Sequence, residues 1–336
     1  MQLLIRVMLL AVILLMAAGC GKYRQTIKEV DSLIENKSYN EALDVLHKAL
    51  QQDPKDKALL RQHVLLFLHT EDVNYATAAY RRLEEVNPQD KILIQSVGHA
   101  NPVVRVTASK ALGYLKDSSA IDALSRATKD TDKSVRRAAV LALGDLRNEA
   151  AIPALVGALD DSYWYVRAEA ALALGKVGDT PSATRLFSML QDEDPYVRDN
   201  VREALQDLAT DENKSAYISA LNSDIPETRR MAAIALACVG DNNSTQVLVT
   251  ELSNQNSDHL LSVIKAAGAL KDPALLPALR NLMDHKNKEI SANVILVLGE
   301  LKDKESVARI KAKLQNKGEP KMVKTACLMA LDLIHP

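Results

Sequence analysis

The chain is poor in aromatic residues and in cysteine. Phenylalanine, tyrosine and tryptophan make up 4% of its 336 residues, with a single tryptophan, and there are three cysteines. Lysine and arginine, 42 in number, nearly balance 43 aspartates and glutamates, so the formal net charge is −1. A balanced surface offers no positive field that would attract phosphates, so we predict no nucleic-acid partner.

Sequence marks of catalysis are also missing. None of the seven histidines is followed by glutamate, and the sequence contains no His-x-x-x-His, Cys-x-x-Cys or Gly-x-Ser-x-Gly motif and no Walker phosphate-binding loop. These motifs place nucleophiles, metal ligands or phosphate-binding amides at the spacing that their chemistry needs. We therefore predict no catalytic residue, no metal site and no cofactor.

What the sequence does contain is a repeat of about 31 residues. One unit, residues 132–161, reads DKSVRRAAVLALGDLRNEAAIPALVGALDD. The middle of successive units is marked by a column of residues that are mostly glycine: Gly113, Gly144, Gly175, Gln206, Ala237, Gly268, Gly299 and Ala330. Self-similarity at such a period predicts stacked supersecondary units, none of which can bury its apolar face alone.

Each unit has the pattern of a helical hairpin. Within residues 132–161, apolar residues recur at helical spacing over 135–143 and again over 152–159. We predict a turn over 144–148, with the glycine breaking the helix there. Asn101-Pro102 and Asp194-Pro195 supply a capping side chain and a proline where a missing N–H costs least. No strand pattern interrupts the array, which predicts an all-α chain.

The repeat pattern D-P-x-V-R-x-x-A-A-x-A-L-G-x-L, followed by A-I-P-x-L, resembles the HEAT repeat, in particular its phycobilisome-lyase-like variety. The resemblance covers about residue 101 onward, in seven full units and a last helix over 321–334. It implies a right-handed α-solenoid superhelix, with residues 91–336 forming the HEAT-like array and presenting an extended surface to proteins or peptides. HEAT-like iron hydroxylases are recognised by repeated His-Glu dipeptides, which have no counterpart here.

Residues 24–90 carry a different repeat. Ala42, Leu46, Ala49, Asp53 and Pro54 recur 34 residues later as Ala76, Tyr80, Leu83, Asn87 and Pro88. This is the period and punctuation of tetratricopeptide repeats. We predict two tetratricopeptide-like hairpins here, joined to the HEAT-like array by a single helix over 91–99.

The first 19 residues are predicted to be a targeting segment rather than part of the fold. Arg6 is their only charge, an apolar run follows, and the small residues Ala17, Ala18 and Gly19 lead to Cys20. Small residues before a cysteine resemble the bacterial lipobox, which implies cleavage after Gly19 and lipidation of Cys20. Residues 20–23 would then be a lipid-anchored N-terminus, and the mature chain would carry 41 basic and 43 acidic residues.

The residue after this cysteine bears on location. In enterobacterial sorting, aspartate at that position favours the inner membrane, so Gly21 favours the outer membrane, with the protein facing the periplasm. An uncleaved N-terminal membrane anchor with an incidental cysteine is the alternative.

The candidate binding residues are aromatic. Tyr163, Trp164 and Tyr165 lie together at a repeat-opening turn, and Tyr196 lies one repeat beyond Tyr165. Exposed aromatic side chains are favoured as binding anchors. We hypothesise that Trp164 contacts a partner protein; the alternative is local packing of this turn against the neighbouring hairpin.

A column of arginines at the repeat period could bind an anionic partner, but a structural role is favoured. Its members are Arg105, Arg136, Arg167, Arg198 and Arg229. Asp130, Asp161 and Asp192 recur at the same period and can pair with them. Cys238 and Cys327 are almost three repeats apart, too far for a disulfide, and we expect free thiols that pack in the core.

These patterns together predict a non-catalytic protein-binding scaffold, tethered to a membrane of the bacterial cell envelope through Cys20, with envelope proteins or peptides as partners. Two alternatives remain. One is a bilin-lyase-like enzyme or another accessory of protein modification. The other is a module that binds a cell-wall fragment or small ligand on Trp164 and its tyrosines.

Overall fold

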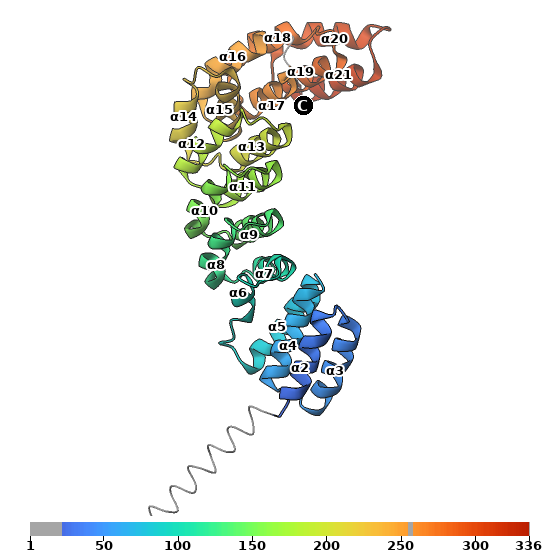
Figure 1. Cartoon of the computed structure of the whole chain (residues 1–336). Helices are drawn as coiled ribbons and strands as arrows, with labels where there is room; N and C mark the ends of the chain where they lie inside the picture. Colours follow the sequence, from blue (N-terminus) through green and yellow to red (C-terminus); the bar gives the residue numbers. More distant parts are fainter. Residues whose placement is uncertain (1–21, 255–257, 336) are drawn as a thin grey trace, which may run out of the picture. The chain divides into compact units, whose positions relative to one another are not determined.

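The computed structural model describes residues 22–254 and 258–335, and in these residues every regular element is helical and none is a strand (Figure 1). The chain divides into two compact units, Met1–Ala170 and Ala171–Pro336, with the boundary inside helix α11 (Trp164–Val177). Gly19 and Cys20, the predicted cleavage and lipidation positions, lie outside the described residues.

The N-terminal part of unit 1 is a set of four helices in which each packs on the next. They are α2 (Arg24–Glu35), α3 (Tyr39–Gln52), α4 (Lys57–His69) and α5 (Val73–Val86). Asp56 and Asp72 begin α4 and α5, since their carboxylates accept hydrogen bonds from the N–H groups of Leu59 and Tyr75. The tetratricopeptide assignment of these helices stays a prediction.

The connecting segment that follows is shorter than expected. We predicted one helix over 91–99, but α6 covers only Ile92–Ser96. The chain then leaves the helix through three-residue turns, in which the N–H groups of Val97, Gly98 and His99 each bond a carbonyl three positions earlier. This tightening is typical of a helix end. The short helix packs on α7, as the prediction required of the segment.

The HEAT-like hairpins each consist of a 10- to 14-residue first helix and a shorter second helix. In unit 1 they are α7 (Pro102–Leu115) with α8 (Ile121–Ala127) and α9 (Lys133–Leu146) with α10 (Ile152–Ala158), followed by the start of α11. In unit 2 they are α12 (Thr180–Met189), α13 (Pro195–Asp207), α14 (Lys214–Ala220), α15 (Pro226–Cys238), α16 (Thr245–Ser253), α17 (Leu260–Leu270), α18 (Leu276–Leu282), α19 (Lys288–Glu300) and α20 (Val307–Gln315). The last helix, α21, spans Lys321–Ile334, which confirms the predicted final element.

The predicted caps are confirmed at the first helices. Asn101 accepts from the Val103 N–H at 3.0 Å and Asp194 from the Tyr196 N–H at 2.9 Å, each with proline at the first helical position. These side chains satisfy amides that have no partner inside the helix. Short 3-10 turns then lead into several second helices, and aspartate or asparagine caps them, as Asp117 does at Ser118–Ala120.

The glycine column does not break the helices, which corrects the predicted turn. Gly113 and Gly144 lie inside α7 and α9, and these helices end two residues later. The residue that stops each helix is three positions beyond the glycine column and adopts a left-handed conformation. These residues are Lys116, Arg147, Lys271 and Lys302, with φ between 48° and 56°. The left-handed residue is what turns the chain out of the helix.

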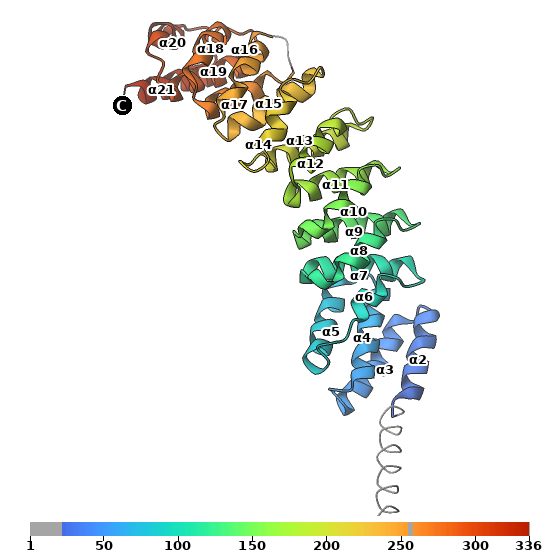
Figure 2. The same ribbon diagram turned by 90° about the vertical axis from the view of Figure 1, so that its left-hand side faces the viewer.

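The glycines instead allow neighbouring first helices to approach closely. A Cβ atom on Gly113 would lie 2.8 Å from Cα of Ala142, and one on Gly299 would lie 2.6 Å from Cα of Ala330. Real Cβ atoms do not come so near to a backbone atom. Figure 2 shows α7 beside α9 and α19 beside α21, the pairs that these glycines bring together.

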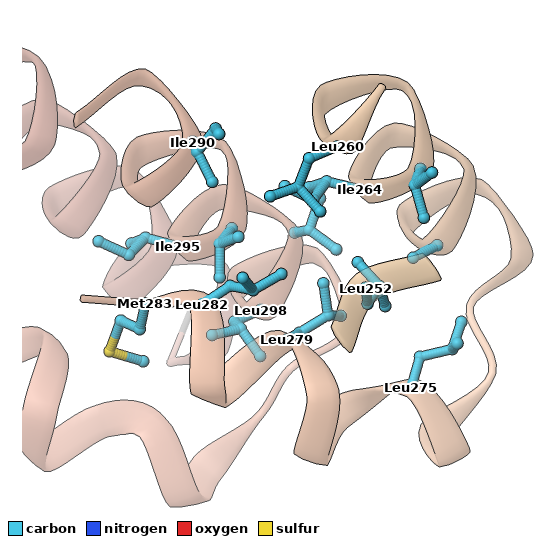
Figure 3. Packing of buried hydrophobic residues seen from close by; sticks show 14 of the residues in the cluster. Leu252, Leu260, Ile264, Leu275, Leu279, Leu282, Met283, Ile290, Ile295 and Leu298 are labelled. Carbon is cyan, nitrogen blue, oxygen red and sulfur yellow. The ribbon is translucent and has the colours of Figure 1, made fainter. Parts of the chain in front are cut away.

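The core of unit 2 is continuous across its hairpins. Buried leucine, isoleucine and methionine side chains from α16 to α19 pack in one cluster, which includes Leu252, Leu260, Ile264, Leu279 and Leu298 (Figure 3). Cys327 is part of this cluster, as predicted. Cys238 is exposed at the end of α15, so its prediction as a core residue was wrong; both thiols are free.

Candidate protein-binding site

The three aromatic residues predicted as a site form a compact cluster at the start of α11. The ring centroids of Tyr163 and Tyr165 are 5.6 Å apart, and those of Trp164 and Tyr165 are also 5.6 Å apart with an interplanar angle of 80°. Edge-to-face contacts of this kind are favourable. Tyr163 and Trp164 are 39% and 43% exposed, so much of their ring surface remains available to a partner.

Basic side chains of the preceding hairpin hold the two tyrosines. The Lys133 ammonium lies 4.6 Å from the centroid of the Tyr163 ring, and the Arg136 guanidinium lies 5.4 Å from it. Arg137 lies 5.8 Å from the centroid of the Tyr165 ring. Such cation–π contacts fix ring orientation and contribute about 0.5–1 kcal/mol each at exposed sites. The local packing that we weighed as an alternative is therefore real for the tyrosines, and it preorganises the cluster.

An ion pair fixes the turn on which the cluster stands. Arg136 donates two hydrogen bonds to the carboxylate of Asp161, at 2.6 and 2.9 Å, and Asp161 in turn accepts from the Tyr163 N–H at 2.9 Å. The side chains of Arg136 and Asp161 are only 12% and 7% exposed. Burial raises the pKa of Asp161, but the hydrogen bonds and the charge of Arg136 outweigh it, so the pKa lies below its usual value.

The whole arginine column has this structural role. Arg105 pairs with Asp130 at 2.8 Å, as Arg136 does with Asp161. In addition, each arginine donates to backbone carbonyl groups of the turn that precedes its own helix. The acceptors include His99 for Arg105, Asp130 for Arg136, Asp161 for Arg167, Asp192 for Arg198 and Ser223 for Arg229. The predicted structural interpretation of the column is confirmed.

A groove of about 660 Å³ adjoins the aromatic cluster. Its apolar lining comes from Val103 and Val106 of α7 and Leu141 of α9, and Tyr165 closes one end. Lys110 and Arg137 supply positive charge. Arg137 is held in place by Glu169, whose carboxylate lies 2.7 Å away. A groove with an apolar floor, charged walls and an aromatic end can accept an extended peptide segment.

The structure brings together three of the four predicted binding residues. Tyr163, Trp164 and Tyr165 share one surface of unit 1, whereas Tyr196 belongs to unit 2, where it is 65% exposed at the second position of α13. Sequence reasoning missed Lys133, Arg137 and the groove. The signal was present, because residues roughly one repeat apart, such as Arg137 and Tyr165, lie on neighbouring hairpins.

Two searches of the described residues bear on other functions. Among residues 22–254 and 258–335, no three histidine, cysteine, aspartate or glutamate side chains gather closely enough to hold a metal ion. None of the helices within those ranges has the length and apolar character that crossing a bilayer requires.

Comparison with known families identifies the fold. The family model of HEAT repeats matches residues 90–175, 158–237, 183–260 and 245–332, which together exceed half of the chain. The chain belongs to the HEAT-repeat family. No curated protein sequence matches it.

Solved structures show the same HEAT-repeat architecture. The chain resembles Kap95p, solved with RanGDP, with a TM-score of 0.61 and 16% identity over 87% of this chain and 46% of Kap95p. It resembles Kap121p bound to Nup53p with a TM-score of 0.53 and 14% identity, over 87% of this chain and 39% of that one. Both proteins are thus more than twice as long as the part that this chain matches, and the likeness shows the fold alone.

A weaker likeness concerns the lyase resemblance. The CpcE–CpcF complex of phycocyanin lyase from Nostoc sp. matches with a TM-score of 0.36 and 20% identity, over 73% of this chain and 92% of that chain. A likeness of this size carries no argument about activity.

Proposed function

We propose that this HEAT-repeat protein is a non-catalytic scaffold that binds a protein segment on unit 1 and is tethered to a bacterial envelope membrane. The observation that carries the binding role is the aromatic cluster of Tyr163, Trp164 and Tyr165 beside the 660 Å³ groove. Large rings that are held rigid lose little conformational entropy on binding, which is why they act as anchors.

The groove chemistry suits a peptide rather than a compact small molecule. Its floor runs along the helices α7 and α9, and its polar groups lie on the walls rather than converging on one point. An extended segment would place apolar side chains on Val106 and Leu141 and its backbone beside Lys110 and Tyr165. The related architecture of Kap121p, solved with Nup53p bound, supports a protein ligand.

The tethering role rests on the lipobox resemblance around Cys20. A lipid would restrict the groove to a thin layer beside the membrane and so raise its effective concentration for partners in the same layer. We propose the outer membrane, facing the periplasm, because glycine follows Cys20.

Lipidation is testable in the full chain. Growth of a bacterium that expresses it with an alkyne-bearing fatty acid should label the protein, and Cys20→Ser should abolish the label. Cys238→Ser, which removes the exposed thiol of α15, is the matched control and should keep it. An unlabelled wild-type chain would contradict lipidation, and an N-terminal peptide that still contains Gly19 would contradict cleavage.

Removal of the tryptophan should weaken partner binding. Affinity capture from lightly crosslinked envelopes identifies the partner, whose affinity is then measured directly. Trp164→Ala should weaken it at least about tenfold, roughly 1.4 kcal/mol, because buried aromatic anchors carry much of the binding energy. Val239→Ala is the control, since Val239 is a comparably exposed apolar residue (37%) in unit 2.

Unchanged affinity in Trp164→Ala, with the helical spectrum intact, would refute the site. The single tryptophan also reports directly on the alternative ligands. A shift of its emission by cell-wall fragments, with no protein captured, would replace the scaffold with a small-ligand module.

A further inference from the structure

The outer face of the last helix, α21, is apolar although it covers nothing. Its inner face packs into unit 2 through Val323, Ala326, Cys327, Ala330 and Ile334. On its outer side four large residues are about half exposed: Met322 (48%), Leu328 (53%), Met329 (52%) and Leu333 (43%). End repeats of a solenoid normally present a polar outer face for solubility. No other described residue packs over these four side chains.

The repeat register explains why this face is apolar. Met329 takes the place that Leu298 has one repeat earlier, and Leu298 is fully buried in α19 between its neighbours α17 and α21. Leu328 takes the place of Val297, which is also buried. The outer face of α21 therefore keeps the composition of a helix that stacks on another helix.

The packing of α21 on α19 brings Leu328 to this surface. In unit 1, Gly113 meets Ala142, and in unit 2 Gly175 meets Ala204 at the same spacing. The residue with that spacing from Gly299 is Leu328, which is too large for the contact, and Ala330 takes its place two positions later. Leu328 is thereby left on the outside.

We propose that this face binds the same face of a second copy of the chain, so that two α21 helices pack antiparallel about a two-fold axis. The surface is self-complementary in charge. Lys321 begins α21 and Asp332 lies near its end, on the same side of the helix at 3.6 residues per turn. An antiparallel pair places each Lys321 opposite the partner's Asp332, whereas a parallel pair places like charges together.

The apolar residues obey the same symmetry. Met322 and Leu333 lie on the other edge of the face, and an axis near residue 327 that pairs Lys321 with Asp332 also sets Met322 opposite the partner's Leu333. Antiparallel packing also aligns the two helix dipoles favourably. One operation therefore covers all four apolar residues and pairs both charges, which is the property of an isologous interface.

The test uses the full chain purified in detergent, with its mass measured by sedimentation over a range of concentrations. A dimer is expected. Met329→Glu should weaken it at least tenfold, while Tyr196→Glu, at a more exposed residue of the same unit, should leave it unchanged. Both variants alter exposed side chains, so both should keep the helical spectrum of the parent.

Charge reversal tests the antiparallel arrangement. Asp332→Lys alone and Lys321→Glu alone should each weaken the dimer, and the double variant should restore it, because only self-pairing returns both opposite-charge contacts. A chain that stays monomeric would overturn the proposal, as would a dimer insensitive to Met329→Glu. A double variant that remains weak would overturn the antiparallel pairing itself.

Discussion

Acidification from pH 7 to about 4 should destabilise the four N-terminal helices by about 3 kcal/mol through one side chain, His63 of α4. His63 is only 9% exposed, and neither of its ring nitrogens has a hydrogen-bond partner in the described part of the chain. Its ring packs between those of His47 and Phe67, at centroid distances of 5.5 and 4.8 Å. Burial, with smaller contributions from the charges of His47 and Arg82, lowers its pKa to about 4.

The direction of the effect follows from proton binding. In the unfolded chain His63 takes up a proton as the pH falls through its ordinary value of 6.5, but in the folded chain it does so only near 4. The unfolded state therefore binds more protons between these values, so the stability is complete above 6.5 and is lost as the pH falls towards 4. Burial also lowers the pKa of His69, which adds a loss of the same sign.

The measurement is hydrogen exchange of α2 to α5 as a function of pH, compared with His63→Phe. The phenylalanine variant keeps an aromatic ring among His47 and Phe67 and cannot take up a proton, so its stability should fall much less below pH 6.5. His335→Gln, at an exposed residue of unit 2, is the control and should retain the parent's pH dependence. Equal acid sensitivity of His63→Phe and the parent would refute the assignment.

Replacing glycine by alanine should have opposite effects at two positions of the repeat array. At Gly299 the new Cβ would lie 2.6 Å from Cα, 2.8 Å from Cβ and 3.2 Å from the carbonyl oxygen of Ala330. These atoms belong to a packed helix and cannot move away cheaply. The overpacking cost, about 3 kcal/mol, exceeds the gain of about 1 kcal/mol from better helix propensity, so Gly299→Ala should lower the free energy of unfolding by about 2 kcal/mol.

Gly157→Ala is the matched control. Gly157 lies in α10, is exposed, and has no atom within 4 Å of the position of an added Cβ. Helix propensity alone acts there, so the variant should be more stable than the parent by up to about 1 kcal/mol. Denaturation followed by circular dichroism gives both signs, and a stabilised Gly299→Ala would contradict close helix approach as the role of the glycine column.

The destabilisation should also be local. In a stack of repeats each hairpin contacts only its neighbours, so Gly299→Ala should speed hydrogen exchange in α19 to α21 and leave α2 to α5 unchanged. Uniform loss of protection along the chain would contradict this nearest-neighbour behaviour.

Local features of the fold were predictable from the sequence. Asn101-Pro102 and Asp194-Pro195 begin helices as expected, and the last helix has the predicted bounds, because capping and helical periodicity depend on residues within a few positions of each other. The pairing of Arg136 with Asp161 was also predictable, since both recur at the repeat period.

Contacts between hairpins were predictable only in part. Tyr163, Trp164 and Tyr165 could be named from the sequence, but Lys133, Arg137 and the groove could not, because these depend on the orientation of one helix against the next. The role of the glycine column was mistaken for the same reason. Gly113 lies two residues before the end of its helix, as a turn-forming glycine also would, and only the position of Ala142 distinguishes the two roles.

The sequence by itself determined that this protein is an array of helical hairpins, because apolar periodicity, caps and a 31-residue period act along the chain. Only the tertiary structure decided which side chains are buried between hairpins and which remain outside. Leu328 shows the physical reason: its volume does not fit against Gly299, so Ala330 makes that contact and Leu328 becomes surface. Such an outcome depends on the space that a neighbouring helix leaves, which no pattern within one repeat encodes.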